Sequence, residues 1–416
     1  MSDKSAIPLD RRANRYSRAM PTHDSHRDTP MARNTPELST STRSASVQKT
    51  SAQHAKPTRR THRRLLAPPL AQKNGIDPIQ LVLPHPEELP EELAPGGRAP
   101  GTIADYLIAR FYSNDPQIIH SRFETGEVRL DDGTVLTTSS PYAPGERIWY
   151  FRELADEPEL PSDMPVLYED EHVLAIDKPH FLPTTPRGSY IAQTALTKLR
   201  VREGNPLLIP IHRLDRPTAG VLLFAKTVQA RRPFQMMFQH RLVSKTYRAV
   251  APVPANPTAA EQALSAEGLR VRSHIQKVRD VLQVRQLSET ECVARGVEPN
   301  TLTTARILET FTPDPAEAEA WGVEPGCPWG LYDLAPHTGK THQLRAHLNL
   351  LGAPILGDVL YPRVLPDGPD RSEHPLQLLA YTLSFEHPIT GEPISLRSGR
   401  TLSAWESKNS AVWEAS

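Results

Sequence analysis

The sequence predicts an α+β fold with a mixed, largely antiparallel sheet in its C-terminal part. Its 416 residues suffice for two compact domains and some unstructured sequence. Residues 165–405 alternate short β-rich runs with fewer helical patterns, and this order favours α+β over a parallel α/β fold. The runs are Val173–Ile176, Val221–Phe224, Tyr247–Val250, Thr303–Leu308, Leu331–Leu334 and Leu379–Phe385. We therefore expect one α+β domain over residues 165–405.

Two stretches of this region have the spacing of helices that bury one face. Val228–Leu242 brings four apolar side chains onto one stripe, which indicates core packing rather than a ligand site. They are Phe234, Met237, Phe238 and Leu242. His342–Leu350 is expected to form a second helix, with Leu344 and Leu348 turned inward.

The residues before this domain divide into a tail and a linker. Residues 1–65 hold 14 Lys/Arg against 5 Asp/Glu and few apolar residues. Such a tail cannot bury enough apolar surface to offset the cost of ordering it, so we expect it to be disordered. Residues 66–96 are rich in proline and are interpreted as an extended linker.

Residues 97–152 are expected to form a small separate module. Ile103–Phe111 has helical apolar spacing, and residues 126–133 have the pattern of a strand that ends in an Asp-Gly turn. Residues 145–150 would supply a closing strand.

The composition favours a cytoplasmic protein. Only Cys292 and Cys327 are present, so a disulfide framework is not expected. No apolar run approaches the ~20 residues needed to cross a bilayer, and no apolar segment typical of a secretory signal follows Met1. We therefore expect no membrane association.

The segment IHRLDRPTAGV, residues 211–221, has the features of a catalytic site. It places Asp215 on a turn between two apolar runs, among the basic residues His212, Arg213 and Arg216. Nearby positive charge favours the ionised form of a carboxyl group. A surface cluster of salt bridges is the alternative interpretation.

This segment closely resembles the HRLDRxTSG signature of the RluA-type pseudouridine synthases, with Ala219 in place of the usual serine. Four further segments match the same family in the same order along the chain. They are Tyr168–Pro179, Lys245–Ala249 (K-x-Y-x-A), Thr338–Leu348 (TGRTHQIRVHL) and Gly352–Tyr361 (G-x-P-I-x-G-D-x-x-Y).

The resemblance implies roles for particular residues. Asp215 would be the catalytic aspartate that attacks the target uridine nucleotide. Tyr247 would pack against the uracil and take part in proton handling near C5, and Arg345 would pair with Asp215. Arg213 would help to open the base stack, and Leu344 would line the pocket under the ring.

Further substrate contacts are expected from His212, Arg216, His342 and Lys340. We expect neither a metal nor an organic cofactor, because an isomerisation needs no redox change and no group donor. The spacing of five between His337, His342 and His347 does not suit a metal site on one helix face. The sequence GKT at 339–341 is not a P-loop, because that motif needs glycine at position 334, which is leucine.

These roles fit the chemistry of pseudouridine formation. The reaction breaks the N1–C1′ bond of uridine, rotates the uracil and forms a C5–C1′ bond. A carboxylate can divide such a reaction into two steps, by acting either at the sugar or on the ring. A base inside an RNA stack must first be flipped out.

The local charge also fits RNA. Residues 196–248 hold 11 Lys/Arg against Glu203 and Asp215, as binding to a phosphate backbone requires. The tail, residues 1–65, is either an arm that contacts RNA phosphates or a solvated extension. The module of residues 97–152 is either an RNA-binding module or a structural cap on the catalytic domain. The alternating arginines of residues 270–285 suggest a strand hairpin, in contact with RNA or simply solvated. The acidic span 309–328 is expected to be an inserted loop without an assigned role.

The function that follows is an RNA pseudouridine synthase acting as a monomer, with 23S ribosomal RNA as the expected target. Transfer RNA is the alternative target, and a catalytically idle RNA-binding or ribosome-assembly protein is the alternative function. A glycoside hydrolase would need a second carboxylate beside Asp215, where the sequence supplies bases instead.

Overall fold

The computed structural model describes residues 68–111, 115–151, 156–365 and 373–406. The expected basic tail, residues 1–65, lies outside these ranges. Within the described ranges, no helix combines the length and the hydropathy that a bilayer crossing requires.

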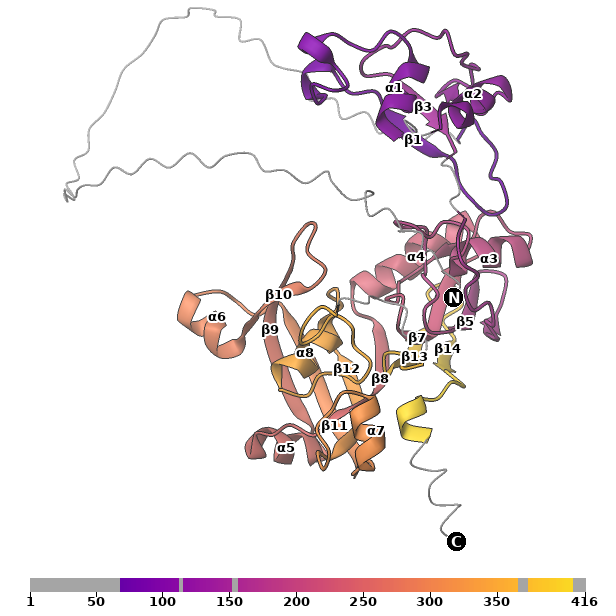
Figure 1. The fold of residues 1–416 in the computed structure, drawn as a ribbon. Coiled ribbons are helices and arrows are strands. Elements are labelled where there is room, and N and C mark those ends of the chain that lie inside the picture. Colours follow the sequence, from indigo (N-terminus) through magenta and orange to yellow (C-terminus); the bar gives the residue numbers. More distant parts are fainter. Residues whose placement is uncertain (1–67, 112–114, 152–155, 366–372, 407–416) are drawn as a thin grey trace, which may run out of the picture. The chain divides into compact units, whose positions relative to one another are not determined.

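The small N-terminal module consists of a three-stranded antiparallel sheet and two helices (Figure 1). Its elements are β1 (Ile79–Val82), η1 (Pro86–Glu88), η2 (Pro95–Gly97), α1 (Ile103–Phe111), α2 (Pro116–Glu124), β2 (Arg129–Leu130) and β3 (Arg147–Tyr150). The strand order is β1-β3-β2. The buried side chains of Leu83, Leu107, Ile119 and Ile148 join the helices to the sheet.

Residues 66–96 are therefore not all linker, and this expectation is wrong for β1. Ile79 pairs with Tyr150 and Val82 with Arg147, so β1 completes the sheet of the module. The prolines that suggested an extended linker flank the strand, where they remove no ladder hydrogen bond.

Residues 166–397 form one mixed, largely antiparallel sheet of eleven strands, as expected. Along the sheet lie β10 (Val284–Ser288), β9 (Leu269–Lys277), β11 (Thr301–Phe311), β12 (Trp329–Pro336), β8 (Val243–Pro252), β13 (Leu378–Glu386), β7 (Ala219–Ala225), β5 (Val173–Lys178) and β4 (Val166–Glu169). Strand β6 (Ile209–Pro210) pairs with β7, and β14 (Pro393–Arg397) pairs with β13. Only the β7–β13 pair is parallel among the described strands.

The contact between β7 and β13 depends on Gly220. This residue has φ +112°, and a Cβ atom there would lie 2.2 Å from the carbonyl oxygen of Ala380. Glycine alone fits such a close approach of two backbones. The strand that follows the Asp215 turn can thereby lie between β13 and β5, inside the sheet.

Strands β5 and β7 are fully buried because a helix covers each face of this part of the sheet. On one face α4 (Val228–Gln239) packs Phe234 and Met237 against Leu223. On the other, α3 (Ala195–Arg202) packs Leu199 against Leu222. Successive residues of a strand point to opposite faces, so both sets of side chains find a partner.

The first predicted helix is confirmed except at its end. Helix α4 stops at Gln239, and Arg241 adopts a left-handed backbone with φ 60°. Leu242 therefore leaves the expected stripe and is 68% exposed. The other three residues of the stripe, Phe234, Met237 and Phe238, pack into the core as predicted.

The other half of the sheet supports α8 (Gln343–Leu350), which confirms the second predicted helix. Leu344 and Leu348 are buried in a cluster with Leu334 and Leu378. His347 is 1% exposed and is hydrogen-bonded to Thr303. Strands β9 and β10 pair as the predicted hairpin.

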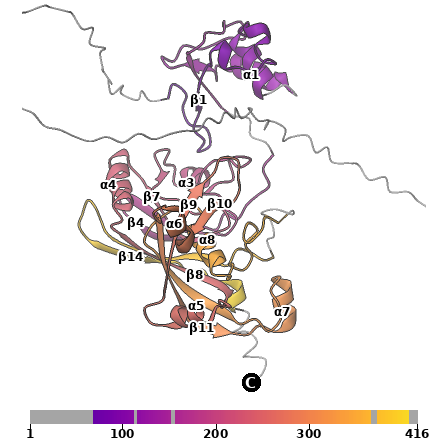
Figure 2. The same cartoon turned by 90° about the vertical axis from the view of Figure 1, so that its left-hand side faces the viewer.

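The span 309–328 is not a plain loop. Strand β11 continues to Phe311, and α7 (Pro315–Ala320) follows with Asp314 as its N-cap. Buried Ala318 packs with Trp329, and Figure 2 shows α7 and α5 (Pro257–Leu264) beside the end of β11. Helix α6 (Glu289–Arg295) follows β10.

Candidate active site

Asp215 lies on a tight turn between β6 and β7. The backbone N–H of Thr218 donates to the carbonyl of Asp215 at 3.0 Å and closes the turn. Thr184 fixes the preceding residue, because its hydroxyl donates to the carbonyl of Leu214 at 2.9 Å and accepts from the N–H of Leu214 at 3.2 Å. The carboxylate is thus presented by backbone held on both sides.

Lys178, the last residue of β5, supports the same turn from the interior. Its ammonium donates to the carbonyls of Pro179, Leu182 and Arg216 at 2.9, 2.7 and 3.2 Å. The side chain is fully buried, and burial lowers its pKa from 10.5 to about 7. Lys178 lies in the family segment Tyr168–Pro179, but the sequence alone indicated no role for it.

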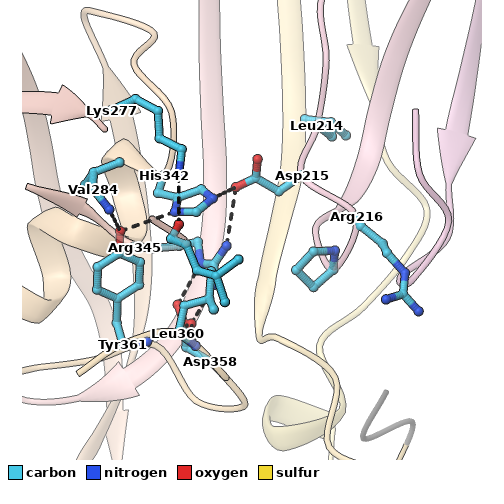
Figure 3. Close-up of polar contacts among 12 residues, drawn as sticks. Leu214, Asp215, Arg216, Lys277, Val284, His342, Arg345, Asp358, Leu360 and Tyr361 are labelled. Carbon is cyan, nitrogen blue, oxygen red and sulfur yellow. Dashed lines mark hydrogen bonds and ion pairs between the residues drawn. The ribbon is translucent and has the colours of Figure 1, made fainter. Parts of the chain in front are cut away.

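Arg345 of α8 faces Asp215 across the site (Figure 3). Its Nη1 lies 3.5 Å from Oδ2 of Asp215. Its Nε and Nη2 donate to the two oxygens of Asp358 at 2.7 and 2.6 Å. Asp358 also accepts the backbone N–H groups of Leu360 and Tyr361. The guanidinium is therefore fixed by one buried carboxylate while it faces a second.

The two carboxylates differ in exposure. The side chain of Asp215 keeps 34% of its surface accessible, whereas those of Arg345 and Asp358 keep 3% and 0%. A ligand can reach Asp215 but not the pair behind it.

His342, at the N-terminus of α8, is the second group that faces Asp215. Its Nε2 lies 3.9 Å from Oδ2 of Asp215, and its Nδ1 lies 3.2 Å from the hydroxyl of Tyr361. The backbone of His342 is left-handed, with φ 54°. Burial lowers the pKa of the imidazole, and the charge of Asp215 opposes this shift only partly.

Tyr247 of β8 lies next to the same carboxylate. It packs at the junction of two apolar clusters, one containing Leu214 and the other Leu344. Burial raises the pKa of its hydroxyl to about 12, and the negative charge of Asp215 adds to the shift. Tyr247 is therefore a neutral phenol at neutral pH.

The structure brings Asp215, Arg345, His342 and Tyr247 together, but it does not do so for all the residues singled out in the sequence. Arg213 is exposed. Figure 3 shows Arg216 extending away from Asp215. Its Nε donates to the carbonyl of Phe181 at 3.0 Å.

The side chain of His212 is directed toward α4, and its expected contact with substrate remains a prediction. The N–H of Leu223 donates to Nε2 of His212, and the imidazole stacks on Phe238 of α4 at 4.7 Å between ring centres. Burial lowers the pKa of this histidine to about 3. The cause is pairing with β7, since Ile211 N–H donates to the carbonyl of Leu223 and directs the next side chain toward α4.

Lys340, an expected substrate contact, lies on the exposed loop before α8. It lines a cavity of about 380 Å³ together with His274, Lys277 and Asn300. In the described parts of the chain, no three His, Cys, Asp or Glu side chains are grouped as metal ligands.

Two residues of the site, Asp358 and Tyr361, lie in the family segment Gly352–Tyr361, but the sequence alone indicated no role for them. Asp358 lies in a loop 13 positions after its partner Arg345. The preceding Gly357 has φ 72°, and a Cβ there would lie 2.5 Å from the carbonyl of Pro375. The Gly357-Asp358 pair in the family segment could have indicated that Asp358 has a structural role. Sequence spacing does not reveal that its partner is the side chain of Arg345.

Comparison with known proteins places this site in a family. Residues 172–350 match the family model described as RNA pseudouridylate synthase. An uncharacterized RNA pseudouridine synthase of Synechocystis is 30% identical over 297 residues, which cover 70% of this chain and 91% of that protein. This chain belongs to the RluA-type RNA pseudouridine synthases. Asp215, Tyr247, His342 and Arg345 lie inside the matched range.

Other relatives of this synthase carry more specific names. The ribosomal large subunit pseudouridine synthase D of Xanthomonas campestris is 32% identical, over 56% of this chain and 66% of that protein. The dual-specificity RNA pseudouridine synthase RluA of Salmonella typhi is 30% identical, over 56% and 91%. The solved structure of human RNA pseudouridylate synthase domain containing 1 is 24% identical, covers 59% of this chain and 86% of that one, and gives a TM-score of 0.43.

Proposed function

We propose that this synthase converts uridine to pseudouridine in large-subunit ribosomal RNA, with Asp215 as the catalytic carboxylate. The observation that supports this role is the contrast at Arg345: the guanidinium is buried with Asp358, and it also faces the accessible Asp215.

The charges of these three groups favour a reactive carboxylate. Arg345 carries one positive charge, which Asp358 already balances through two short hydrogen bonds. Asp215 therefore receives an oriented contact without full neutralisation of its charge. Such a carboxylate is held in position and remains available to attack, as nucleophilic catalysis requires.

The reaction then needs a carboxylate and a closed apolar pocket. Asp215 acts on the uridine nucleotide, either at C1′ or on the ring, and the N1–C1′ bond breaks. The uracil turns, C5 bonds to C1′, the hydrogen at C5 leaves as a proton, and N1 gains one. Leu214, Leu344 and the ring of Tyr247 supply apolar surface beside Asp215 that retains the loosened base.

The role of Tyr247 follows from its protonation. A phenol with a pKa of about 12 keeps its hydrogen at neutral pH and does not accept another. We therefore assign Tyr247 to stacking on the uracil and to hydrogen-bond donation rather than to removal of the C5 proton.

RNA contacts are proposed for the exposed cations around the site. Arg213 lies two positions before Asp215 and is exposed, so it is suited to occupy the space that a flipped base leaves. Lys340 and Lys277 line the cavity described above and are suited to phosphate contact.

The choice of RNA rests on the names of relatives. One is a large-subunit ribosomal enzyme, another is named dual-specificity, and a third is the tRNA pseudouridine synthase C of Vibrio parahaemolyticus. Large-subunit RNA is our proposal, and transfer RNA is the alternative.

The test uses C5-tritiated RNA from cells that lack this protein, separated into large-subunit, small-subunit and transfer RNA. Tritium release from the large-subunit fraction alone is expected, because C5 loses its hydrogen during the reaction. Release from the transfer RNA fraction alone would contradict the proposed target but not the proposed chemistry.

A further inference from the structure

His342 connects Asp215 to Tyr361 through its two ring nitrogens. Figure 3 shows the imidazole between these side chains, with dashed contacts on both sides. The ring meets that of Tyr361 edge-on, with an interplanar angle of 90°. Arg345 packs over the same tyrosine ring at 5.5 Å. His342 is thus held between two groups that are themselves fixed.

The groups at both ends of the imidazole select one tautomer. The hydroxyl oxygen of Tyr361 accepts the backbone N–H of Val284 at 3.0 Å, and its own hydrogen can be donated to Nδ1 of His342, 3.2 Å away. At the other end, an ionised Asp215 can only accept, so it favours a hydrogen on Nε2. The lowered pKa of His342 keeps the ring neutral at neutral pH.

Both contacts to the Asp215 carboxylate reach the same oxygen. Arg345 Nη1 and His342 Nε2 approach Oδ2, at 3.5 and 3.9 Å. No contact to Oδ1 is recorded among the residues that the structure describes. Figure 3 shows this second oxygen pointing away from both partners.

We propose that His342 is a positioning residue rather than a substrate contact. Its neutral ring, oriented by Tyr361, directs Nε2–H at Oδ2 of Asp215 and, with Arg345, leaves Oδ1 for the substrate. The separation of 3.9 Å exceeds a hydrogen bond, so the proposal requires this distance to shorten when substrate fills the site. This assignment rests on the proposed catalytic role of Asp215.

The first test reads the tautomer in the full-length enzyme without substrate. The chain holds 16 histidines, so His342→Asn identifies the signals of His342 by their loss from spectra of ¹⁵N-histidine-labelled protein. We expect a protonated Nε2 and an unprotonated Nδ1 at pH 7, and loss of this preference in Tyr361→Phe. A protonated Nδ1, or an imidazolium, would overturn the proposal whether or not turnover is detected.

The second test separates positioning from RNA binding. Asparagine tolerates the left-handed backbone at 342 but is too short to reach Asp215, whereas glutamine is longer. His342→Asn should slow single-turnover isomerisation roughly 10- to 100-fold, with RNA affinity within about twofold of wild type. His342→Gln should recover part of the rate. His337→Asn, on the exposed part of the same loop, is the control and should match wild type.

The pH profile gives a readout that a merely structural role would not change. Loss of a donor to the carboxylate favours its protonated form, so the acid limb of the rate should move to higher pH in His342→Asn. The charged or titratable groups around this pair are Arg345, Asp358, Tyr361, Lys277, Tyr247 and Lys178. They are unchanged in the variant.

Weaker RNA binding with an unchanged rate and profile would make His342 a substrate contact and contradict the proposal. If the wild type modified none of the RNA fractions, the proposed target would fail, and the tautomer measurement would still decide the role of His342.

Discussion

The two sides of the active site are built in opposite ways. On one side, the Asp215 turn presents an accessible carboxylate, and its neighbours in sequence turn elsewhere: His212 to Phe238 and Arg216 to Phe181. On the other side, α8 and the loop after it form a buried network around Arg345 and Asp358. The recorded side-chain contacts of the Asp215 carboxylate therefore come from Arg345 and His342, about 130 positions away, and buried Lys178 also interacts with its charge.

This difference predicts where substitutions act. A change on the α8 side breaks a buried network and lowers stability as well as activity. A change at Asp215 itself affects mainly an accessible group, and therefore activity.

Asp358→Asn is expected to have the largest effect on stability. It leaves the buried Arg345 without its charged partner, which costs about 3–5 kcal/mol in the free energy of unfolding. Urea unfolding measures this. Asp163→Asn, at a side chain that is 78% exposed, is the control and should change the free energy of unfolding by less than about 0.5 kcal/mol. Equal stability of the two variants would contradict the asymmetry.

Lys178 makes stability depend on pH on the Asp215 side. Its pKa in the folded protein is about 7, below the ordinary 10.5, so between these values the unfolded chain binds a proton that the native state lacks. The free energy of unfolding should therefore rise with pH across this window, by up to about 1.4 kcal/mol per unit from this residue.

Lys178→Met should reduce that rise. Urea unfolding at pH 7.5, 8.0 and 8.5 measures the slope, below the range where tyrosines, with an ordinary pKa of about 10, begin to titrate. The variant also loses hydrogen bonds to three carbonyls, so its stability should fall at every pH. An unchanged slope would show that the lysine is charged in the folded protein.

Tyr247→Phe tests a residue that packs against both sides of the site, near Leu214 on one side and near Leu344 on the other. The ring and its packing remain, so RNA affinity should stay within about twofold, while loss of the hydroxyl donor should slow single-turnover isomerisation roughly tenfold. Unchanged rates would restrict Tyr247 to stacking.

Removal of residues 1–65 should have the smallest effect. The segment carries 14 basic against 5 acidic residues, so its loss should weaken RNA binding most at low salt, without changing the rate at saturating RNA. An identical salt dependence of the truncated chain would make the segment a passive extension.

Much of the fold followed from apolar patterns, because the strands and helices that position the site bury regular faces. The mixed sheet, α8 and most of α4 were predicted in this way. Strand β1 was missed because its prolines resemble those of a linker. Helix α7 was missed because its acidic residues suggested a loop.

The site was less predictable than the fold. The family segments predicted Asp215, Tyr247 and Arg345 as site residues, and the structure places them close together, but the segments did not indicate side-chain directions. His212 adjoins the motif and yet faces α4, because pairing with β7 decides its direction. The partnership of Arg345 with Asp358 depends on how the loop after α8 folds back, which no local pattern encodes.

The most direct test of the central claim is single-turnover tritium release from C5-labelled RNA by wild type and Asp215→Asn, with Asp163→Asn as control. Asparagine keeps the size of Asp215 and removes its charge, so RNA binding should persist while the rate falls by at least about 10³-fold. Turnover by Asp215→Asn at a rate close to that of the control would contradict the assignment of Asp215 as the catalytic carboxylate.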